Sequence, residues 1–217
     1  MARKLTIPLL CGEAKKFAEV ESRHFEPSIF GTTDGKAVGT YFEHKFQRYL
    51  KGRYKYVQGN SARGIDFPGL GVDVKVTSIR QPQSSCPYKS ARQKIFGLGY
   101  SLLVFVYEKT DDRKRKAGRL KVLHAVFVEK ERTADFQMSK QLNDIIKNEG
   151  NIDDAMAFMM DRNLPVDEIE ARKIAEEVIK NPPNIGYLTI SNALQWRLQY
   201  SRIIEKAGKV AGLHKLV

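Results

Sequence analysis

The chain has 217 residues, of which 42% are hydrophobic, so it can form a folded core and is far from the composition of a disordered protein. Its 37 lysines and arginines outnumber its 25 acidic residues and give a formal net charge of +12. Such an excess attracts polyanions, most often nucleic acid, although a generically basic ribosomal or membrane-surface protein is the alternative. The positive charge is spread through folded-looking sequence, which favours a shaped binding surface.

The cysteines and the apolar runs restrict the compartment. Cys11 and Cys86 lie far apart and fit neither a zinc site nor a disulfide framework, so we expect a reducing compartment and a cytoplasmic protein. The four histidines are scattered without the spacing of metal ligands. No apolar run reaches membrane-spanning length, and the run near the N-terminus is too short for a signal peptide. We expect no membrane partner.

The N-terminal segment, residues 1–36, is the least informative. Residues 14–21 suggest a short helix and residues 30–35 a loop. The segment is either an arm that touches DNA or a dimer partner, or a structural wrap around the core. We favour the wrap.

Residues 37–52 predict an amphipathic helix that Gly52 ends. Its apolar residues recur every four positions and form one stripe, Val38, Phe42, Phe46 and Leu50. Glu43 sits beside this stripe and can point toward a sheet. The alternative is a surface pair with Lys45 or a neighbouring base.

Residues 53–58 read as a strand and residues 59–61 as a turn. The stretch that follows, residues 64–77, predicts a β-hairpin, because two apolar runs flank Pro68-Gly69-Leu70-Gly71. In its second limb Val72, Val74 and Val76 alternate with Asp73, Lys75 and Thr77. A period of two places Asp73 and Lys75 on one face, and the turn can bring Asp66 beside Asp73.

This arrangement gathers two carboxylates and an ammonium at one sheet edge. Two adjacent carboxylates repel each other unless a cation lies between them, and Mg²⁺ is the divalent ion that oxygen ligands most plausibly hold there. The lysine beside it can orient or deprotonate a water, or stabilise charge on a phosphate. An exposed hairpin with a solvated charged face is the alternative, which the upstream Glu43 makes less favoured.

Residues 78–88 form a polar loop that leaves the second limb, and residues 89–98 suggest a helix with a basic face. Amide, hydroxyl and guanidinium groups are the side chains that reach bases and phosphates, and basic helix faces can follow a backbone. An ordinary polar connection and a solvated face are the alternatives. The predicted DNA contacts are Arg80, Gln81, Gln83, Ser84 and Ser85 in the loop, and Lys89, Arg92, Gln93 and Lys94 in the helix.

Two apolar runs predict the centre of a sheet. Residues 101–108 read as a buried strand and residues 120–128 as its antiparallel neighbour, joined by the charged loop 110–118. The predicted fold is α/β (α+β), a mixed central sheet of four to five strands flanked by helices. Its predicted parts are an N-terminal arm or wrap (1–36), a core (37–130) and a helical C-terminal region (131–217).

The C-terminal region predicts helices over residues 138–147, 152–160 and 166–179, with a stop at Asn181-Pro182-Pro183. Residues 189–207 resemble a helix-turn-helix weakly, and one continuous helix is slightly favoured. The region is a possible DNA-contacting or dimerisation subdomain.

The order of these residues resembles the PD-(D/E)XK nuclease superfamily, and within it the type II restriction endonucleases. The matching residues are Glu43 on a helix, Asp66 after an apolar run and Asp73-Val74-Lys75 after a short turn. The match covers roughly residues 37–128. Ile65 stands where the motif has proline, and the interval between Asp66 and Asp73 is short.

The resemblance implies a restriction-endonuclease-like core and a Mg²⁺-dependent endonuclease for double-stranded DNA. It implies that Asp66, Asp73 and the Val74 carbonyl bind the metal, that Lys75 positions the attacking water, and that Glu43 assists the metal shell. A symmetric homodimer is expected, because cutting both strands of a palindrome needs two sites. The alternatives are a repair or junction-resolving nuclease of the same fold and a DNA-binding protein without catalytic activity.

Overall fold

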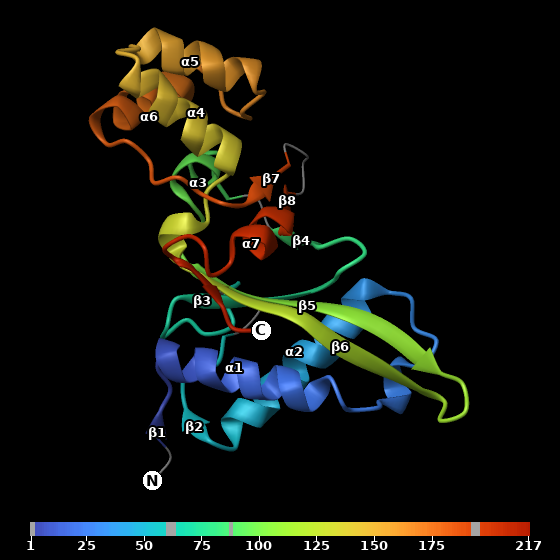
Figure 1. The fold of residues 1–217 in the computed structure, drawn as a ribbon. Coiled ribbons are helices and arrows are strands. Elements are labelled where there is room, and N and C mark those ends of the chain that lie inside the picture. The colour runs from blue at the N-terminus through green and yellow to red at the C-terminus, as the bar shows by residue number, and fades with distance from the viewer. Residues whose placement is uncertain (1–2, 60–63, 87–88, 192–195) are drawn as a thin grey trace. The chain divides into compact units, whose positions relative to one another are not determined.

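The computed structural model describes residues 3–59, 64–86, 89–191 and 196–217 (Figure 1). The chain divides into two compact units. Residues 1–84, 101–128 and 206–217 form one, here called the sheet unit, and residues 85–100 and 129–205 form the other, here called the helical unit.

A mixed four-stranded sheet is the centre of the sheet unit. Its strands, in spatial order, are β3 (Val72–Ser78), β5 (Ser101–Asp112), β6 (Ala117–Val128) and β9 (Leu213–Lys215). β3 runs parallel to β5, whereas β5 with β6 and β6 with β9 are antiparallel. The predicted mixed α/β architecture and the antiparallel pairing of the two apolar strands are confirmed. Among the described residues β3 is an edge strand of this sheet, with a strand partner on one side of its backbone only.

Two helices pack against this sheet, α1 (Ile7–Glu21) and α2 (Gly35–Lys51). α1 begins seven residues before the predicted position, with a proline in its first turn, where a missing N–H costs nothing. Its buried face, which includes Leu10, Ala14 and Phe17, joins the core of the sheet unit. α2 matches the predicted helix, with Asp34 as its N-cap and Gly52 as its C-cap.

Four phenylalanine rings hold the helices to the sheet. Phe17 of α1 lies 5.2 Å from Phe42 and 5.1 Å from Phe46 of α2, measured between ring centroids. Phe105 of β5 lies 5.0 Å and 5.3 Å from the same two rings. Aromatic pairs at these separations stabilise the fold beyond the burial of their surface, so these contacts hold α2 in place against the sheet.

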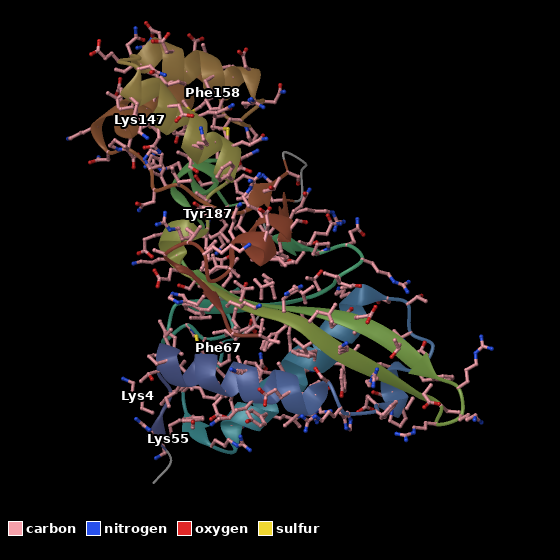
Figure 2. The ribbon with its side chains drawn as sticks, viewed as in Figure 1. Lys4, Lys55, Phe67, Lys147, Phe158 and Tyr187 are labelled. Atoms are coloured by element: carbon pink, nitrogen blue, oxygen red, sulfur yellow. The ribbon has the colours of Figure 1, made fainter. Side chains whose placement is uncertain are left out.

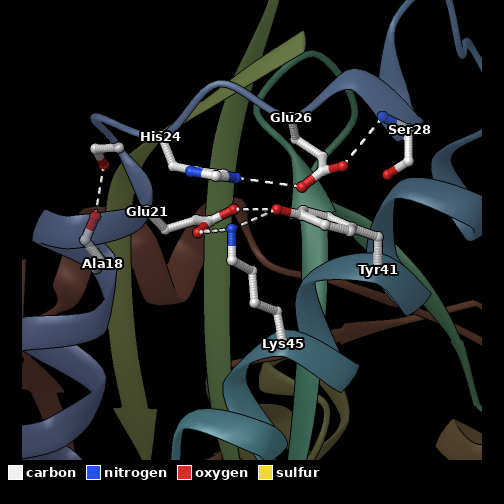
Figure 3. A network of polar contacts seen from close by, with 8 residues as sticks. Ala18, Glu21, His24, Glu26, Ser28, Tyr41 and Lys45 are labelled. Atoms are coloured by element: carbon white, nitrogen blue, oxygen red, sulfur yellow. Dashed lines mark hydrogen bonds and ion pairs between the residues drawn. The ribbon is translucent and has the colours of Figure 1, made fainter. Parts of the chain in front are cut away.

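A polar cluster fixes the end of α1 to α2 (Figure 3). Tyr41 donates to Glu21 Oε1 at 2.8 Å, and Lys45 Nζ lies 2.9 Å from Glu21 Oε2. Lys45 also donates to the Tyr41 hydroxyl at 2.6 Å. Burial and the neighbouring Glu21 carboxylate raise the pKa of Tyr41, so it stays a donor. Lys45 therefore pairs with Glu21, and the alternative that it pairs with Glu43 is wrong.

The smaller strands of the sheet unit are shorter than the sequence predicts. The predicted strand 53–58 is reduced to β2 (Tyr54–Lys55), which pairs in parallel with β1 (Arg3–Lys4). Lys4 and Lys55 are labelled in Figure 2, as is Phe67, which is buried in the core. A 3₁₀ turn, Pro27–Ile29, lies between α1 and α2. Of the predicted turn 59–61, positions 60 and 61 lie outside the described residues.

The helical unit contains the three helices that periodicity predicts. They are α4 (Phe136–Lys147), α5 (Ile152–Asp161) and α6 (Glu168–Lys180), with a 3₁₀ turn (Lys130–Arg132) before them and α3 (Arg92–Phe96) packed on them. A small sheet of order β4-β8-β7 completes the elements, with β4 (Gln83–Cys86), β8 (Trp196–Gln199) and β7 (Thr189–Ile190). β4 falls in the predicted loop 78–88, of which positions 87 and 88 are not described.

The expectation for residues 189–207 is wrong in both forms. They hold two short antiparallel strands, β7 and β8, followed by α7 (Ser201–Lys206). Trp196, Leu198 and Tyr200 are buried while Arg197 and Gln199 are exposed, which is the period of a strand. Positions 192–195, inside the predicted helix, lie outside the described residues.

None of the helices in the described ranges is both long and apolar enough to cross a membrane.

The aromatic core predicts that replacing two different phenylalanines by alanine will destabilise the protein to very different extents. Phe46→Ala should lower the free energy of unfolding by about 3–5 kcal/mol, because it leaves a cavity between α1, α2 and β5. Phe30→Ala, at a side chain that is 38% exposed, should cost less than about 1 kcal/mol. Urea titration of both variants measures the difference, and equal losses would contradict this account of the core.

Candidate active site

Strand β3 separates the core residues from the polar ones by simple alternation. Val72, Val74 and Val76 point into the core with α1 and α2. Asp73 and Lys75 share the opposite face, where Lys75 Nζ lies 2.8 Å from Asp73 Oδ2. Asp73 is buried and Lys75 half-buried, so this ion pair is partly shielded from water.

The turn before β3 brings Asp66 back to the strand. Phe67 N–H donates to the Val72 carbonyl at 2.9 Å, and Val72 N–H donates to the Phe67 carbonyl at 3.3 Å. Gly71 takes a φ of +63°, which a side chain would disfavour. The predicted hairpin is correct only as this one bridge, because residues 64–66 form no strand. The tight turn suffices, since Asp66 Oδ2 accepts from Val74 N–H at 2.8 Å.

The carboxyl groups in this place are crowded. Burial, together with the Asp73 carboxyl within hydrogen-bonding reach, raises the pKa of Asp66 to about 7, although Val74 N–H and Lys75 oppose the shift. Burial, and after it the charge of Asp66, raises the pKa of Glu43 to about 7, with Lys75 again opposing. The site therefore binds protons more readily than separate carboxylates do, and a bound cation would relieve the same strain.

Gln47, one turn after Glu43 on α2, orients Asp66. Its Nε2 donates to Asp66 Oδ1 at 3.0 Å, and its Oε1 accepts from Gln58 Nε2 at 3.1 Å. Tyr56 donates to the Gln47 carbonyl at 3.0 Å. Sequence reasoning missed Gln47, although its spacing of four from Glu43 places both on one face of the helix.

These groups line one hollow of about 350 Å³, here called the acidic hollow. Its lining residues are Glu43, His44, Gln47, Gln58, Gly59, Gly64, Ile65, Asp66, Asp73, Val74 and Lys75. The predicted catalytic side chains thus come together in one place.

The donor set fits a hard divalent cation. Two adjacent carboxylates with a neighbouring backbone carbonyl and water supply the oxygen ligands that such ions take. Over the described ranges, no three Asp, Glu, His or Cys side chains are grouped closely enough to hold a metal by themselves. Glu43 therefore fits a ligand that acts through water better than a direct one.

The residues of loop 78–88 that are predicted to contact DNA differ in their exposure to solvent. Arg80, Gln81 and Ser85 are exposed, and Gln83 and Ser84 are half-buried.

The predicted basic helix needs a correction. α3 is only five residues long, and Lys94 is buried with 5% exposure, so it cannot follow a phosphate backbone as part of a solvent-facing surface. Burial lowers its pKa, with Asp135 opposing the shift. Arg92 forms an ion pair with Glu177, and Gln93 donates to the Leu98 carbonyl. Lys89 is exposed.

Comparison with known proteins decides the family. A model described as type II restriction enzyme NspV matches residues 4–215. The type II restriction enzyme NspV of Nostoc sp. is 65% identical over 209 residues, which are 96% of this chain and 95% of the relative. The chain belongs to the NspV family of type II restriction enzymes. No solved structure matches it.

Membership in the NspV family makes the protein an enzyme, a site-specific deoxyribonuclease. Enzymes of this class generally use divalent metal ions, in agreement with the oxygen ligands of the acidic hollow. The alternative of a DNA-binding protein without catalytic activity is excluded.

The crowded carboxyls predict the stability of the metal-free protein. The fold raises the pKa of Asp66 and Glu43 from the usual value near 4 to about 7. The stability that their protonated forms contribute is complete below about pH 4 and is lost as the pH rises through about 7. In EDTA at pH 8, the Asp66→Asn variant should therefore melt at a higher temperature than the wild type. The increase should be about 2–4 °C for each kcal/mol gained in the free energy of unfolding.

The control is the same comparison in acid. Near pH 4 the wild-type carboxyls are protonated, so the difference in melting temperature between Asp66→Asn and the wild type should vanish. A variant that melts lower than the wild type at pH 8 in EDTA would show that Asp66 is not under electrostatic strain.

Proposed function

We propose that this enzyme is a Mg²⁺-dependent endonuclease that cuts both strands of DNA at a specific site and leaves 5′-phosphate and 3′-hydroxyl ends. The observation that carries the proposal is the meeting of Asp66, Asp73 and Lys75 beside Glu43 in the acidic hollow. NspV itself is named as a type II restriction enzyme. The metal, the products and the roles of the residues are inferred from the site itself.

In this proposal Asp66, Asp73 and the Val74 carbonyl hold the metal, with Glu43 acting through water. The direction of the backbone at Val74 supports this role for the carbonyl. Val74 N–H points away from β5 to Asp66, and in a β-strand the N–H and C=O of one residue point to the same side. The Val74 carbonyl therefore faces the open edge of β3 beside the two carboxylates. A bound Mg²⁺ supplies charge neutralisation at the phosphate and at the leaving 3′ oxygen.

Lys75 prepares the attacking water in this proposal. Asp73 holds its ammonium group at 2.8 Å, so its Nζ is kept beside the carboxyl groups of the acidic hollow. From there its positive charge orients the water, stabilises the hydroxide that forms when the water loses a proton to solvent, and stabilises the negative charge that grows on the phosphate.

We further propose a homodimer in the cytoplasm. Hydrolysis at one acidic hollow cuts one strand, so two copies related by a two-fold axis match a palindromic duplex. The cytoplasmic location rests on the two separate cysteines, Cys11 and Cys86, neither of which forms a disulfide within the described residues.

Removal of single groups tests the assignment. Asp73→Ala and Lys75→Ala should each lower the rate of plasmid cleavage by at least about 10²–10³-fold, because each removes a group that acts on the reacting phosphate. EDTA should abolish wild-type cleavage, and added Mg²⁺ should restore it. Agarose gels of digested plasmid give the rates, and filter binding checks that both variants still bind DNA.

The matched control for Asp73 is Asp112→Asn, which removes a carboxylate at the far end of β5 and should cut normally. Discrete bands from unmodified plasmid are expected, because a junction-resolving enzyme would not cut ordinary duplex at fixed sites. If either alanine variant keeps the wild-type rate, the assignment is wrong.

The hydrogen bond from Gln47 to Asp66 predicts that loss of the Gln47 side chain will raise the Mg²⁺ concentration that cleavage requires. Gln47→Ala frees Asp66 Oδ1 and should raise the Mg²⁺ concentration for half-maximal cleavage by about 10–100-fold, as loss of a group that orients a metal ligand does. Gln58→Ala, which removes only the bond to Gln47, should have a smaller effect. Cleavage rates measured over a Mg²⁺ series decide between them. An unchanged Mg²⁺ requirement in Gln47→Ala would exclude the orienting role.

A further inference from the structure

A second hollow, of about 330 Å³, adjoins the acidic one on α2. Its lining residues are His44, Gln47, Arg48, Lys51 and Gln58. His44, Gln47 and Gln58 line both hollows, so the hydrogen-bonded pair of Gln47 and Gln58 forms their common wall. We call it the basic hollow.

The two hollows differ in charge. The acidic hollow has three carboxyl groups, whereas the described residues that line the basic one include no carboxyl group. Arg48 and Lys51 are exposed, and neither forms an ion pair within the described part of the chain. Their side chains stand at i and i+3 of one helix, where neighbours lie about 5–6 Å apart between Cβ atoms, so both can reach one small anion.

We propose that the basic hollow binds a backbone phosphate of the DNA strand being cut, close to the phosphate held in the acidic hollow. This rests on the proposed function, because it takes the acidic hollow as the place of hydrolysis. Arg48 and Lys51 carry the charge that recognises the phosphate. Gln47 links the two subsites, since it orients Asp66 on one side and lines the basic hollow on the other.

The spacing agrees with the spacing of DNA. From Glu43 to Arg48 is five residues, or about 7.5 Å along a helix axis. Successive phosphates of one strand advance by about 3.4 Å along the duplex, so a separation of about 7.5 Å corresponds to about two nucleotides between the phosphate in the basic hollow and the one cleaved. Phosphate contacts of this kind set the register of a protein on the duplex without reading its sequence.

A competing explanation for Arg48 and Lys51 is their place in the last turn of α2. Positive charge there complements the helix dipole and is worth about 0.3–1 kcal/mol of stability. That role moves the free energy of unfolding but leaves the salt dependence of DNA binding unchanged. The two explanations therefore separate in one binding experiment.

The test compares Arg48→Gln/Lys51→Gln with Lys15→Gln/Arg23→Gln, which removes one lysine and one arginine from exposed positions of and after α1. Fluorescence anisotropy of a labelled mixed-sequence duplex in EDTA gives the affinity over a salt series. Loss of one phosphate contact should lower the slope of log K against log salt by about 1. The affinity lost between about 50 and 200 mM salt should then shrink by about 3.5-fold.

A second measurement uses cleavage. Multiple-turnover digestion of plasmid should show KM raised several-fold in the Arg48→Gln/Lys51→Gln variant with kcat kept, because the contact is made equally before and during reaction. Once the cut position is mapped, replacing the neighbouring phosphate by an uncharged methylphosphonate should weaken wild-type binding and leave the variant unchanged.

The proposal is overturned if the Arg48→Gln/Lys51→Gln variant keeps the wild-type slope of log K against log salt. It is also overturned if the Lys15→Gln/Arg23→Gln variant lowers that slope by the same amount. The binding arm needs neither metal nor cleavage. Continued cutting by Asp73→Ala would reject the proposed function, whereas an unaltered salt slope would reject only the phosphate subsite.

Discussion

One hydrogen bond determines the arrangement of the site, the bond from Val74 N–H to Asp66 Oδ2 at 2.8 Å. Strand β3 is at the edge of its sheet, so its outward backbone groups have no strand partner. Asp66 satisfies one of these groups, and the turn from Phe67 to Val72 holds it there. The outward edge of β3 is therefore the place where carboxyl groups from two sides of a turn, those of Asp66 and Asp73, come together.

The local pattern of this stretch predicted most of the site. Alternation along β3 placed Asp73 and Lys75 on one face, and the Pro/Gly turn placed Asp66 beside them, because both arguments depend only on backbone periodicity and a short connection. The apolar stripe of α2 likewise predicted which face Glu43 borders. The mixed sheet followed from the two long apolar strands.

Other parts depended on contacts that local pattern does not contain. Gln47 orients Asp66 across nineteen positions of sequence, and only the packing of α2 on β3 brings them together. Lys94 reads as a surface base, yet the short helix α3 buries it beside Asp135. Trp196 and Leu198 lie two positions apart, the period of a strand that the helical interpretation of residues 189–207 overlooked, and β8 pairs with β7.

The central claim is that Asp66, Asp73 and the Val74 carbonyl hold one divalent cation at the edge of β3. The most direct test is a crystal structure of the enzyme grown with Mn²⁺, in which anomalous scattering locates the ion. We expect the ion in the acidic hollow, with oxygens of all three residues at about 2.1 Å. An ion bound elsewhere, or carboxylates of Asp66 and Asp73 that turn away from it, would contradict this account.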